Sequence, residues 1–439
     1  MAAWTLPTTA TAPFCPAEVK GTVPVSQGLP TWRQLMAFVG PGLLISVGYM
    51  DPGNWATDIA AGSQYGYGLL FVVAASSLAG IVLQTLSARL GIAAGQDLAQ
   101  LCRANYPRPA VLTLWAFAEL AIVACDVAEV LGAALALQLL LHLPLWAGVL
   151  VTALDTAIVL GLKGRGFRQI EAIVLALVAT IGVAFALVLF LAPPDPAAAA
   201  AGLVPSPALL SDPNALYLAI GILGATVMPH NLYLHSSVVQ TRALGAGEAA
   251  QRRAIGFATL DIAGSLLIAA VINGAILVMA AAAFHAHGRA TADIAEAYQL
   301  LAPVAGPAAA LLFGLALLAS GQSSTFTGTI AGQVIMEGFL KLSIPCWQRR
   351  LITRALALVP ALIGVLWLGE KGVGALLVLS QVVLSLQLPF ALWPLIRFNR
   401  RRDIVGRFIA PPWLTALAWL LFAAITIANL WLLIRLVAP

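Results

Sequence analysis

Eleven apolar stretches, each about 20 residues or longer, set the strongest limit on how this chain can fold. A helix needs about 20 apolar residues to cross the roughly 30 Å hydrocarbon core of a bilayer. Only 9% of the residues are charged and 61% are hydrophobic, so a water-soluble surface is excluded. The sequence therefore predicts an all-α, polytopic membrane protein with eleven transmembrane helices. The predicted spans are residues 36–65, 69–92, 110–141, 144–162, 170–191, 216–240, 254–284, 304–339, 351–368, 374–396 and 413–437.

The distribution of basic residues predicts the orientation. Lys and Arg near membrane ends are retained on the cytoplasmic side. With the N-terminus inside, all but three of the 23 Lys and Arg residues fall in cytoplasmic loops, the exceptions being Arg289, Lys371 and Arg435. An odd number of spans then places the C-terminus outside. The net positive charge reflects this orientation and requires no nucleic-acid partner.

The order of the spans predicts five segments. Residues 1–34, rich in Pro, Thr and Ala and without the pattern of a cleaved signal, are expected to form a flexible cytoplasmic tail. Residues 35–191 hold the first five spans, 192–213 form an extracellular linker, 214–397 hold the next five, and 398–439 form a basic cytoplasmic loop and the last span. Because five is an odd number, the second half is inverted in the membrane relative to the first. We therefore expect two inverted five-helix repeats.

Each half opens with an interrupted helix. Proline follows Asp51 and Met228 in the middle of long apolar runs, in the strings Asp-Pro-Gly-Asn and Met-Pro-His-Asn. A proline inside a helix removes a backbone hydrogen bond, so both helices should break near mid-membrane and free backbone groups for a ligand. Paired breaks in corresponding halves of a membrane protein are the best sequence indication of a transporter's substrate site.

The breaks carry an unusual set of donor atoms. A carboxylate such as Asp51 is costly in hydrocarbon and indicates a functional site, and no Lys or Arg lies at that depth to make it a structural ion pair. Asn54 offers an amide oxygen three residues on, although capping of the new helix start is an equal alternative. Met228 adds a thioether, which in most membrane helices only packs. We expect freed carbonyls near Gly48 and Ala225.

This donor set predicts a site for a divalent transition metal. Ca²⁺ and Mg²⁺ prefer shells of oxygen alone, whereas Mn²⁺, Fe²⁺, Co²⁺ and Cd²⁺ tolerate or prefer a sulfur ligand. One carboxylate with neutral ligands makes a modest binder, as a carrier that must release its ion requires. Affinity order alone would disfavour Mn²⁺, so the choice of metal also depends on availability.

The third span carries three carboxylates, Glu119, Asp126 and Glu129, at spacings that place them on one helical face. A stripe of buried carboxylates predicts a proton pathway. For each residue taken singly, pairing with an arginine or participation in a polar network is an equal alternative. Asp51 is expected to lose or pass a proton as the metal arrives, because a dication favours the charged carboxylate.

Two long strings carry a resemblance to a known family: residues 51–57 (DPGNWAT) and 224–236 (GATVMPHNLYLHS). They resemble the Nramp family of proton-coupled divalent metal transporters, close to its bacterial manganese-transport members, and the eleven-helix plan extends the likeness over nearly the whole chain. The resemblance implies a LeuT-like fold with discontinuous first and sixth helices. It also implies that Asp51, Asn54, Met228 and the Ala225 carbonyl bind the metal. A branch without the methionine would have pointed toward magnesium.

The same resemblance assigns a proton route. It matches Asp126 and Glu129 to the route, with His230 beside the metal site and Arg349 or Arg350 toward the cytoplasm. For the arginines, an equal alternative is that they are only positive charges retained on the cytoplasmic side. We favour His230 as a proton carrier over a metal ligand or a packing residue.

Gln381, in the tenth span opposite the first break, is expected to complete the metal shell in one conformational state, with an interhelical hydrogen bond as the alternative. The sequence thus predicts a monomeric symporter that imports Mn²⁺ and related metals with H⁺ by alternating access across a bacterial plasma membrane, without a cofactor. One alternative is an amino acid or cation symporter of the same fold, although Asp51 would repel a substrate carboxylate. A magnesium carrier and a channel are further alternatives. An enzyme is disfavoured, because no nucleophile, phosphate-loop or two-histidine zinc motif is present.

Overall fold

The computed structural model describes residues 20–26, 28–154, 167–243, 245, 247–289, 291, 293–342, 344–369 and 372–437. Its architecture is helical throughout, with a single two-residue strand pair. The long helices are α4 (Leu70–Ala94), α6 (Arg108–Leu141), α9 (Phe167–Leu191), α14 (Glu248–Ala283), α16 (Pro307–Leu340), α17 (Cys346–Leu368), α18 (Val373–Phe398) and α20 (Pro412–Val437).

Shorter elements connect and cap these helices. They are β1 (Val23–Pro24), α1 (Thr31–Phe38), α2 (Pro41–Ser46), η1 (Val47–Met50), α3 (Pro52–Tyr65), η2 (Gly66–Leu69), α5 (Leu98–Asn105), α7 (Leu145–Val151), η3 (Thr152–Leu154), α10 (Pro196–Ala201), α11 (Pro207–Ser211), α12 (Pro213–Val227), α13 (Pro229–Val238), η4 (Val239–Thr241), β2 (Arg242–Ala243), η5 (His285–His287), α15 (Ile294–Ala305) and α19 (Arg402–Val405).

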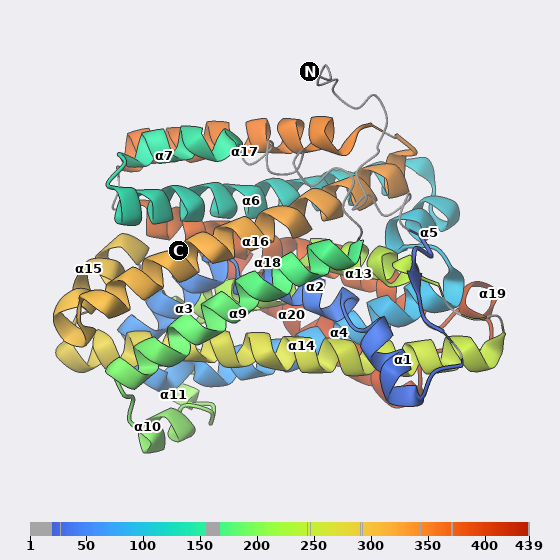
Figure 1. Ribbon diagram of the computed structural model, residues 1–439, viewed down its shortest axis with the longest axis horizontal. Coiled ribbons are helices and arrows are strands. Elements are labelled where there is room, and N and C mark those ends of the chain that lie inside the picture. Colours follow the sequence, from blue (N-terminus) through green and yellow to red (C-terminus); the bar gives the residue numbers. More distant parts are fainter. Residues whose placement is uncertain are drawn as a thin grey trace.

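Most of the long helices run along the long axis of the molecule, and several of the short helices lie at its two ends (Figure 1). Helices α1, α5 and α19 lie at one end, on the right of Figure 1, and α10, α11 and α15 lie at the other. In a membrane these two ends face the two aqueous sides. The predicted linker, residues 192–213, contains α10 and α11.

Nine helical segments among the described residues are long and apolar enough to cross a membrane. One of them, Pro52–Ala94, combines parts of the first and second predicted spans. The fourth predicted span begins with the short apolar helix Leu145–Leu154, and its remainder lies in residues 155–166, outside the described residues. The chain is therefore a multi-pass helical membrane protein, while the number eleven stays a prediction.

Both predicted helix breaks are confirmed. Helix α2 and the 3-10 turn η1 end at Asp51, which is extended (φ −72°, ψ 167°), and α3 begins at Pro52. Helices α12 and α13 meet at Met228, with α13 beginning at Pro229. Proline fits the first position of a helix, where its missing N–H costs nothing. The prolines therefore start the second half of each broken helix.

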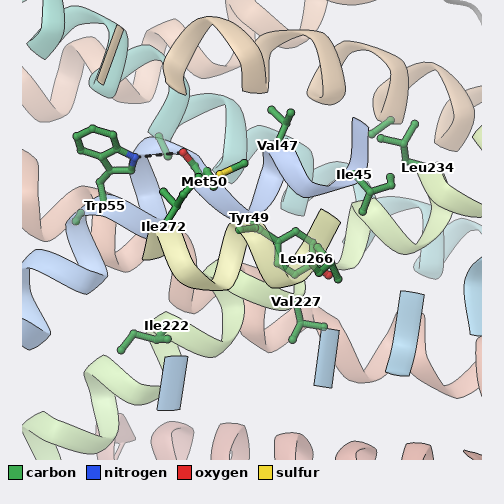
Figure 2. Packing of buried hydrophobic residues seen from close by; sticks show 14 of the residues in the cluster. Ile45, Val47, Tyr49, Met50, Trp55, Ile222, Val227, Leu234, Leu266 and Ile272 are labelled. Carbon is green, nitrogen blue, oxygen red and sulfur yellow. Dashed lines mark hydrogen bonds between the residues drawn. The ribbon is translucent and has the colours of Figure 1, made fainter. Parts of the chain in front are cut away.

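Aromatic packing fixes the start of α3 against the surrounding helices. Trp55 is fully buried and meets Phe185 of α9 and Phe313 of α16 edge to face, at centroid distances of 4.8 and 5.1 Å. Its indole N–H donates to the Met50 carbonyl at 3.2 Å, as Figure 2 shows. Edge-to-face pairs are a favoured aromatic geometry. The indole thus anchors the first break.

The N-terminal segment packs against the end of the molecule that carries α1. Strand β1 pairs in parallel with β2, with Val23 opposite Arg242, and Gly21 N donates to Gln240 O at 3.0 Å. Lys20 Nζ donates to Gly95 O at 2.9 Å. Residues 20–25 are therefore held against the rest of the protein, whereas the sequence predicted that they belong to a flexible tail. The physical reason is a strand partner about 220 positions away in the sequence, which local composition does not indicate.

Candidate metal site

Asp51 caps helix α3 with one oxygen and leaves the other available. Its Oδ1 accepts from Asn54 N at 2.7 Å and from Asn54 Nδ2 at 2.8 Å. Its Oδ2 is buried and has no hydrogen-bond partner among the described residues. The capping role suggested for Asn54 therefore belongs to Asp51. A buried carboxylate oxygen without a partner is costly, so a cation at this position would be strongly favoured.

The Asn54 amide marks a point where oxygen atoms converge from both breaks. Its Nδ2 donates to Asp51 Oδ1, to Gly48 O at 3.2 Å and to Ala225 O at 3.0 Å. The hydrogens of the amide thus occupy a place surrounded by a carboxylate and two freed carbonyls. Rotating the amide by half a turn would direct its own oxygen to this point. A cation could then replace the amide hydrogens.

The remaining carbonyls of the unwound turn have side-chain donors. Asn273 Nδ2 of α14 donates to Tyr49 O at 2.6 Å, and Ser320 Oγ of α16 donates to Met50 O at 2.6 Å. Buried backbone groups are nearly always paired, so these donors allow the helix to stay open. In the described structure, Asn54 is the side-chain donor to the two other freed carbonyls, Gly48 O and Ala225 O.

Met228 brings its sulfur to the first break from the second. A Cβ placed on Gly48 would lie 3.1 Å from Met228 Sδ and 2.3 Å from Asn231 Nδ2. Asn231 Nδ2 also lies 3.6 Å from the sulfur. The absence of a side chain at Gly48 therefore lets the thioether approach the unwound turn. The sequence analysis gave Asn231 no role, although its position three residues after Met228 on a helix start could have indicated this contact.

Gln381 of α18 lies directly on the first turn of α3. A Cβ on Gly53 would be 1.8 Å from Gln381 Nε2, so only glycine accommodates this approach. Gln381 Nε2 donates to Ser380 Oγ at 2.9 Å, and its Oε1 has no partner among the described residues. The structure thus brings the Gln381 amide against Gly53, which lies between Asp51 and Asn54 in the chain.

The assembled site is closed to solvent. Asp51, Ala225, Met228 and Gln381 have no exposed surface, and Asn54 is 1% exposed. Among the ion pairs of the described residues none involves Asp51. Within the described residues there is no group of three or more His, Cys, Asp or Glu side chains that could hold a metal. Any metal here must therefore rely on one carboxylate, carbonyl and amide oxygens, and sulfur.

Two of the three carboxylates of α6 meet at one point. A Cβ on Gly328 of α16 would lie 3.1 Å from Glu129 Oε1 and 3.6 Å from Asp126 Oδ1. Both residues are 1% exposed. His230 of α13 is 2% exposed and has no hydrogen-bond partner for Nδ1 within the described structure. The close helix approach at Gly328 thus gathers the predicted proton-pathway groups.

Glu119 follows the alternative that the sequence left open. It forms an ion pair with Arg349 of α17 and accepts from Trp115 Nε1 at 3.0 Å. Arg349 is 5% exposed, so it is a buried partner and not simply a surface charge. A Cβ on Gly332, one turn after Gly328, would lie 3.3 Å from Arg349 Nε. The side chain of Arg350 lies outside the described residues.

Several buried charges escaped the sequence analysis. Asp58 lies within α3 and is 1% exposed, and Asp261 lies within α14 and is 5% exposed. Asp261 Oδ2 accepts from Gly40 N at 3.2 Å and Gly42 N at 2.8 Å, which caps the start of α2. The spacing of seven between Asp51 and Asp58 could have indicated their shared helical face.

Arg242 was counted as a charge of an inner loop. Instead it is 2% exposed and pairs with Glu171 of α9 at 2.7 Å. Its guanidinium also donates to Phe38 O at 2.8 Å and Val39 O at 3.0 Å, the carbonyls at the end of α1. Arg354, likewise counted as a loop charge, is buried within α17. A positive-inside count cannot separate such buried arginines from solvated ones.

The family can be assigned from the whole sequence. A profile described as "Natural resistance-associated macrophage protein-like", the Nramp profile, matches residues 42–435. The chain belongs to the Nramp family. The chain is 61% identical over 435 residues to a divalent metal cation transporter MntH of Ralstonia nicotianae, covering 99% of this chain and 98% of the relative. It is 64% identical over 433 residues to MntH 1 of Pseudomonas aeruginosa, covering 98% of each.

Solved structures agree with the fold of this Nramp chain. A mutant of the Eremococcus coleocola manganese transporter matches with a TM-score of 0.88 at 38% identity, covering 94% of this chain and 89% of that one. Mhp1, a nucleobase-cation-symport-1 family transporter, matches with a TM-score of 0.62 at 16% identity, covering 98% of this chain and 94% of that chain. The expected LeuT-like fold is confirmed, and the relatives are transporters and not enzymes.

Proposed function

We propose that this chain is a proton-coupled symporter that imports Mn²⁺, and with it Fe²⁺, Co²⁺ and Cd²⁺, by alternating access. Membership of the Nramp family and the close relatives named as divalent metal cation transporters support this function. The proposed ligands are Asp51, Asn54, Met228 and the Ala225 carbonyl, with Gly48 O and Gln381 added in one or more conformational states.

One observation carries the proposal. Three oxygen atoms, Asp51 Oδ1, Gly48 O and Ala225 O, converge within 3.2 Å of the Asn54 amide nitrogen, between two broken helices. Beside them stand the unpartnered Asp51 Oδ2 and the Met228 sulfur. Such a mixed set favours a transition metal over Mg²⁺ and Ca²⁺, because neither gains much from a thioether.

Alternating access is supported by the burial of the site. Its side chains have almost no exposed surface, so the ion can enter or leave only if helices around the breaks move. Hinged or rocking motion of one helix group around a fixed site is the general mode of transporters with inverted repeats. An inside-negative voltage would favour entry by about 2.3 kcal/mol per charge per 100 mV.

The proposed proton route starts at Asp51 and His230 and continues through Asp126, Glu129 and the Glu119–Arg349 pair, with Arg350 toward the cytoplasm. The gathering of Asp126 and Glu129 at Gly328, and of Arg349 at Gly332, one turn along α16, supports a continuous row of groups. A dication that binds Asp51 favours its charged form, so metal arrival would release a proton into this row.

We further propose that the protein lies in the bacterial plasma membrane with its N-terminus in the cytoplasm and its C-terminus outside, and that it functions as a monomer without a cofactor. The basic residues at the α1 end support this orientation. The divalent ion and H⁺ are then the transported species.

The test is Mn²⁺ uptake into proteoliposomes that contain the purified protein, with internal pH recorded and excess Mg²⁺ or Ca²⁺ as competitor. We expect Mn²⁺ entry with internal acidification that Mg²⁺ and Ca²⁺ do not inhibit. In the Met228→Ala variant the oxygen ligands remain, so uptake should persist more weakly and become sensitive to Mg²⁺ and Ca²⁺.

The outcomes separate the competing functions. Mn²⁺ uptake abolished by equimolar Mg²⁺ in the unmodified protein would indicate a magnesium carrier. Absence of Mn²⁺ uptake together with Na⁺-dependent amino acid uptake would indicate the amino acid symporter of the same fold. Full uptake by Asp51→Ala would remove the proposed site.

A further inference from the structure

An aromatic groove lies on the outside of the helix bundle, away from the metal site. It has a volume of about 550 Å³ and lies between the beginning of α6, the end of α18 and α20. Its lining residues are almost all apolar, and Phe390 and Trp393 are 40% and 44% exposed. Ring contacts hold its walls: Phe390 stacks near Phe117 at 4.3 Å, and Trp393 meets Phe422 at 5.9 Å. The volume falls in the range of ligand sites, ~300–1,000 Å³.

One end of the groove is polar and basic. Arg397, one turn after Trp393, places its guanidinium 5.7 Å from the centroid of the Trp393 ring. Arg108 begins α6 two residues before Ala110, which lines the groove. Neither arginine has an ion-pair partner among the described residues. Two cations without anionic partners therefore flank the same end of the groove.

A buried hydroxyl lies at this end as well. Tyr106 lines the groove, and its hydroxyl is buried without a hydrogen-bond partner in the described part of the chain. The ring of Tyr106 lies 5.6 Å from the ring of Phe398, the residue after Arg397, and Arg401 Nη1 donates to Oδ1 of Asn105, the residue before Tyr106, at 2.7 Å. A buried hydroxyl without a partner is costly, so an acceptor from a ligand would be favoured here.

We propose that this groove is a binding site for one anionic phospholipid of the surrounding leaflet, whose acyl chains lie along the aromatic walls and whose phosphate lies at Arg397, Arg108 and Tyr106. The groove opens on an apolar span, so its occupant in a membrane is a lipid. The uncompensated cations and the free hydroxyl select an anionic headgroup. Basic pockets between transmembrane helices on the cytoplasmic side bind such headgroups.

The competing explanation is that these arginines only reflect the general excess of positive charge on the inner side. The chain offers a matched control for this explanation. Arg33 also stacks on a tryptophan, with its guanidinium 5.1 Å from the Trp32 ring, but it lies on α1, away from the groove. If the groove is a specific site, replacing Arg397 should weaken lipid binding and replacing Arg33 should not. If only the general surface charge matters, both replacements should have the same effect.

The experiment is native mass spectrometry of the purified full chain after addition of equal amounts of dioleoyl phosphatidylglycerol and dioleoyl phosphatidylcholine. We expect preferential retention of one phosphatidylglycerol. In the variant with Arg108→Gln and Arg397→Gln this preference should fall about 30-fold, because each basic residue near an anionic surface strengthens binding by about fivefold. Arg33→Gln should keep the preference for phosphatidylglycerol.

A second pair of variants tests the groove itself. Thr113→Trp, which fills the groove without changing charge, should reduce retention of both lipids. Leu112→Trp, outside the groove, should not.

Several results would overturn the proposal. These are equal retention of the two lipids by the unmodified protein, an equal loss in Arg33→Gln, no effect of Thr113→Trp, or displacement of the lipid by glycerol phosphate, which lacks acyl chains. Only the assignment to the cytoplasmic leaflet rests on the proposed orientation. Lipid retention is read by mass and Mn²⁺ uptake by flux, so failure of either proposal is distinguishable from failure of the other.

Discussion

At the scale of single residues, Met228 carries a backbone conformation that its side chain disfavours. Its φ is 30° and its ψ 107°, whereas the other two described non-glycine residues with positive φ, His142 and Lys341, are left-handed caps at helix ends. Such conformations cost of order 1–3 kcal/mol and persist where surrounding structure enforces them. The sulfur is thus held at the first break at an energetic cost, as expected for a functional position.

The contact between Gly53 and Gln381 allows the proposed role of the Gln381 amide in metal binding to be tested. Ala at position 53 would displace the Gln381 amide, whose atoms supply all three of the nearest contacts of the added Cβ. We expect Gly53→Ala and Gln381→Ala each to lower Mn²⁺ uptake about tenfold, equivalent to about 1.4 kcal/mol. The double variant should be no worse than Gln381→Ala, because both changes remove one interaction. Additive losses in the uptake assay would show that Gly53 acts independently of Gln381.

At the scale of elements, two short polar contacts decide how helix ends are held. Asp97 caps α5 through a reciprocal pair of hydrogen bonds with Gln100, and Asp261 caps α2 from the middle of α14. Caps of this kind satisfy N–H groups that a helix leaves unpaired. The first follows from the local sequence, whereas the second depends on the packing of α14 against α2.

The Asp97 cap predicts a pH dependence of stability. Burial raises the pKa of Asp97 from 3.8 to about 7, with Glu337 adding to the rise and Arg103 opposing it. Because the pKa is higher in the folded state, the contribution of this residue is full below about pH 4 and is lost as the pH rises through about 7. Asparagine caps as well as aspartate but does not ionise.

We therefore expect the melting temperature of Asp97→Asn to fall less than that of the unmodified protein between pH 5 and pH 8. Asp97→Ala should lose the cap at both pH values, at a cost of about 1 kcal/mol. Thermal unfolding of the purified variants measures both effects. Equal pH dependence in the aspartate and asparagine proteins would contradict the assignment.

The ion pair between Arg242 and Glu171 links the end of α1 to α9, because Arg242 also donates to the carbonyls at the end of α1. Removing Arg242 leaves the buried Glu171 with only the 42% exposed Arg168 as an ion-pair partner, and the cost should approach, without exceeding, the about 3–5 kcal/mol of breaking a buried pair. Arg242→Gln should therefore release α1 and α2 from α9 and raise labelling of a cysteine placed at the buried position Ser46. The control, Arg401→Gln, breaks an exposed pair with Asp403, which contributes about 0–1 kcal/mol.

Both variants are made in a background without the native cysteines, and labelling uses a membrane-impermeant thiol reagent in inside-out vesicles. If Arg401→Gln exposed position 46 as strongly as Arg242→Gln, the closure would not depend on the buried pair.

At the scale of the whole molecule, the inverted halves and the charge asymmetry predict the sides of the two termini. Eleven crossings with the N-terminus inside place the C-terminus, after Arg435, outside. Alkaline phosphatase fused to the C-terminus should be active, and green fluorescent protein fused there should be dark, because the first requires the exterior and the second the cytoplasm. The reverse result would require either an even number of crossings or the opposite orientation of the chain.

The sequence by itself determined the class, the two breaks and the set of donor atoms that the breaks carry. Apolar length fixes a membrane helix, and a proline with its neighbours fixes a helix start, so both are local properties. The strings around Asp51 and Met228 also carried the family resemblance. These features depend on residues close together in the chain, which is why reading the sequence was sufficient.

Tertiary structure alone decided which polar groups meet. Asn54 donates to Ala225 O across 171 positions of the sequence, and Arg242 donates to Glu171 across 71 positions. Glu119 was equally compatible with a proton pathway or an arginine partner until α17 placed Arg349 beside it. Such contacts depend on how helices pack and how closely glycines such as Gly53 and Gly328 let them approach, and no local pattern contains that information.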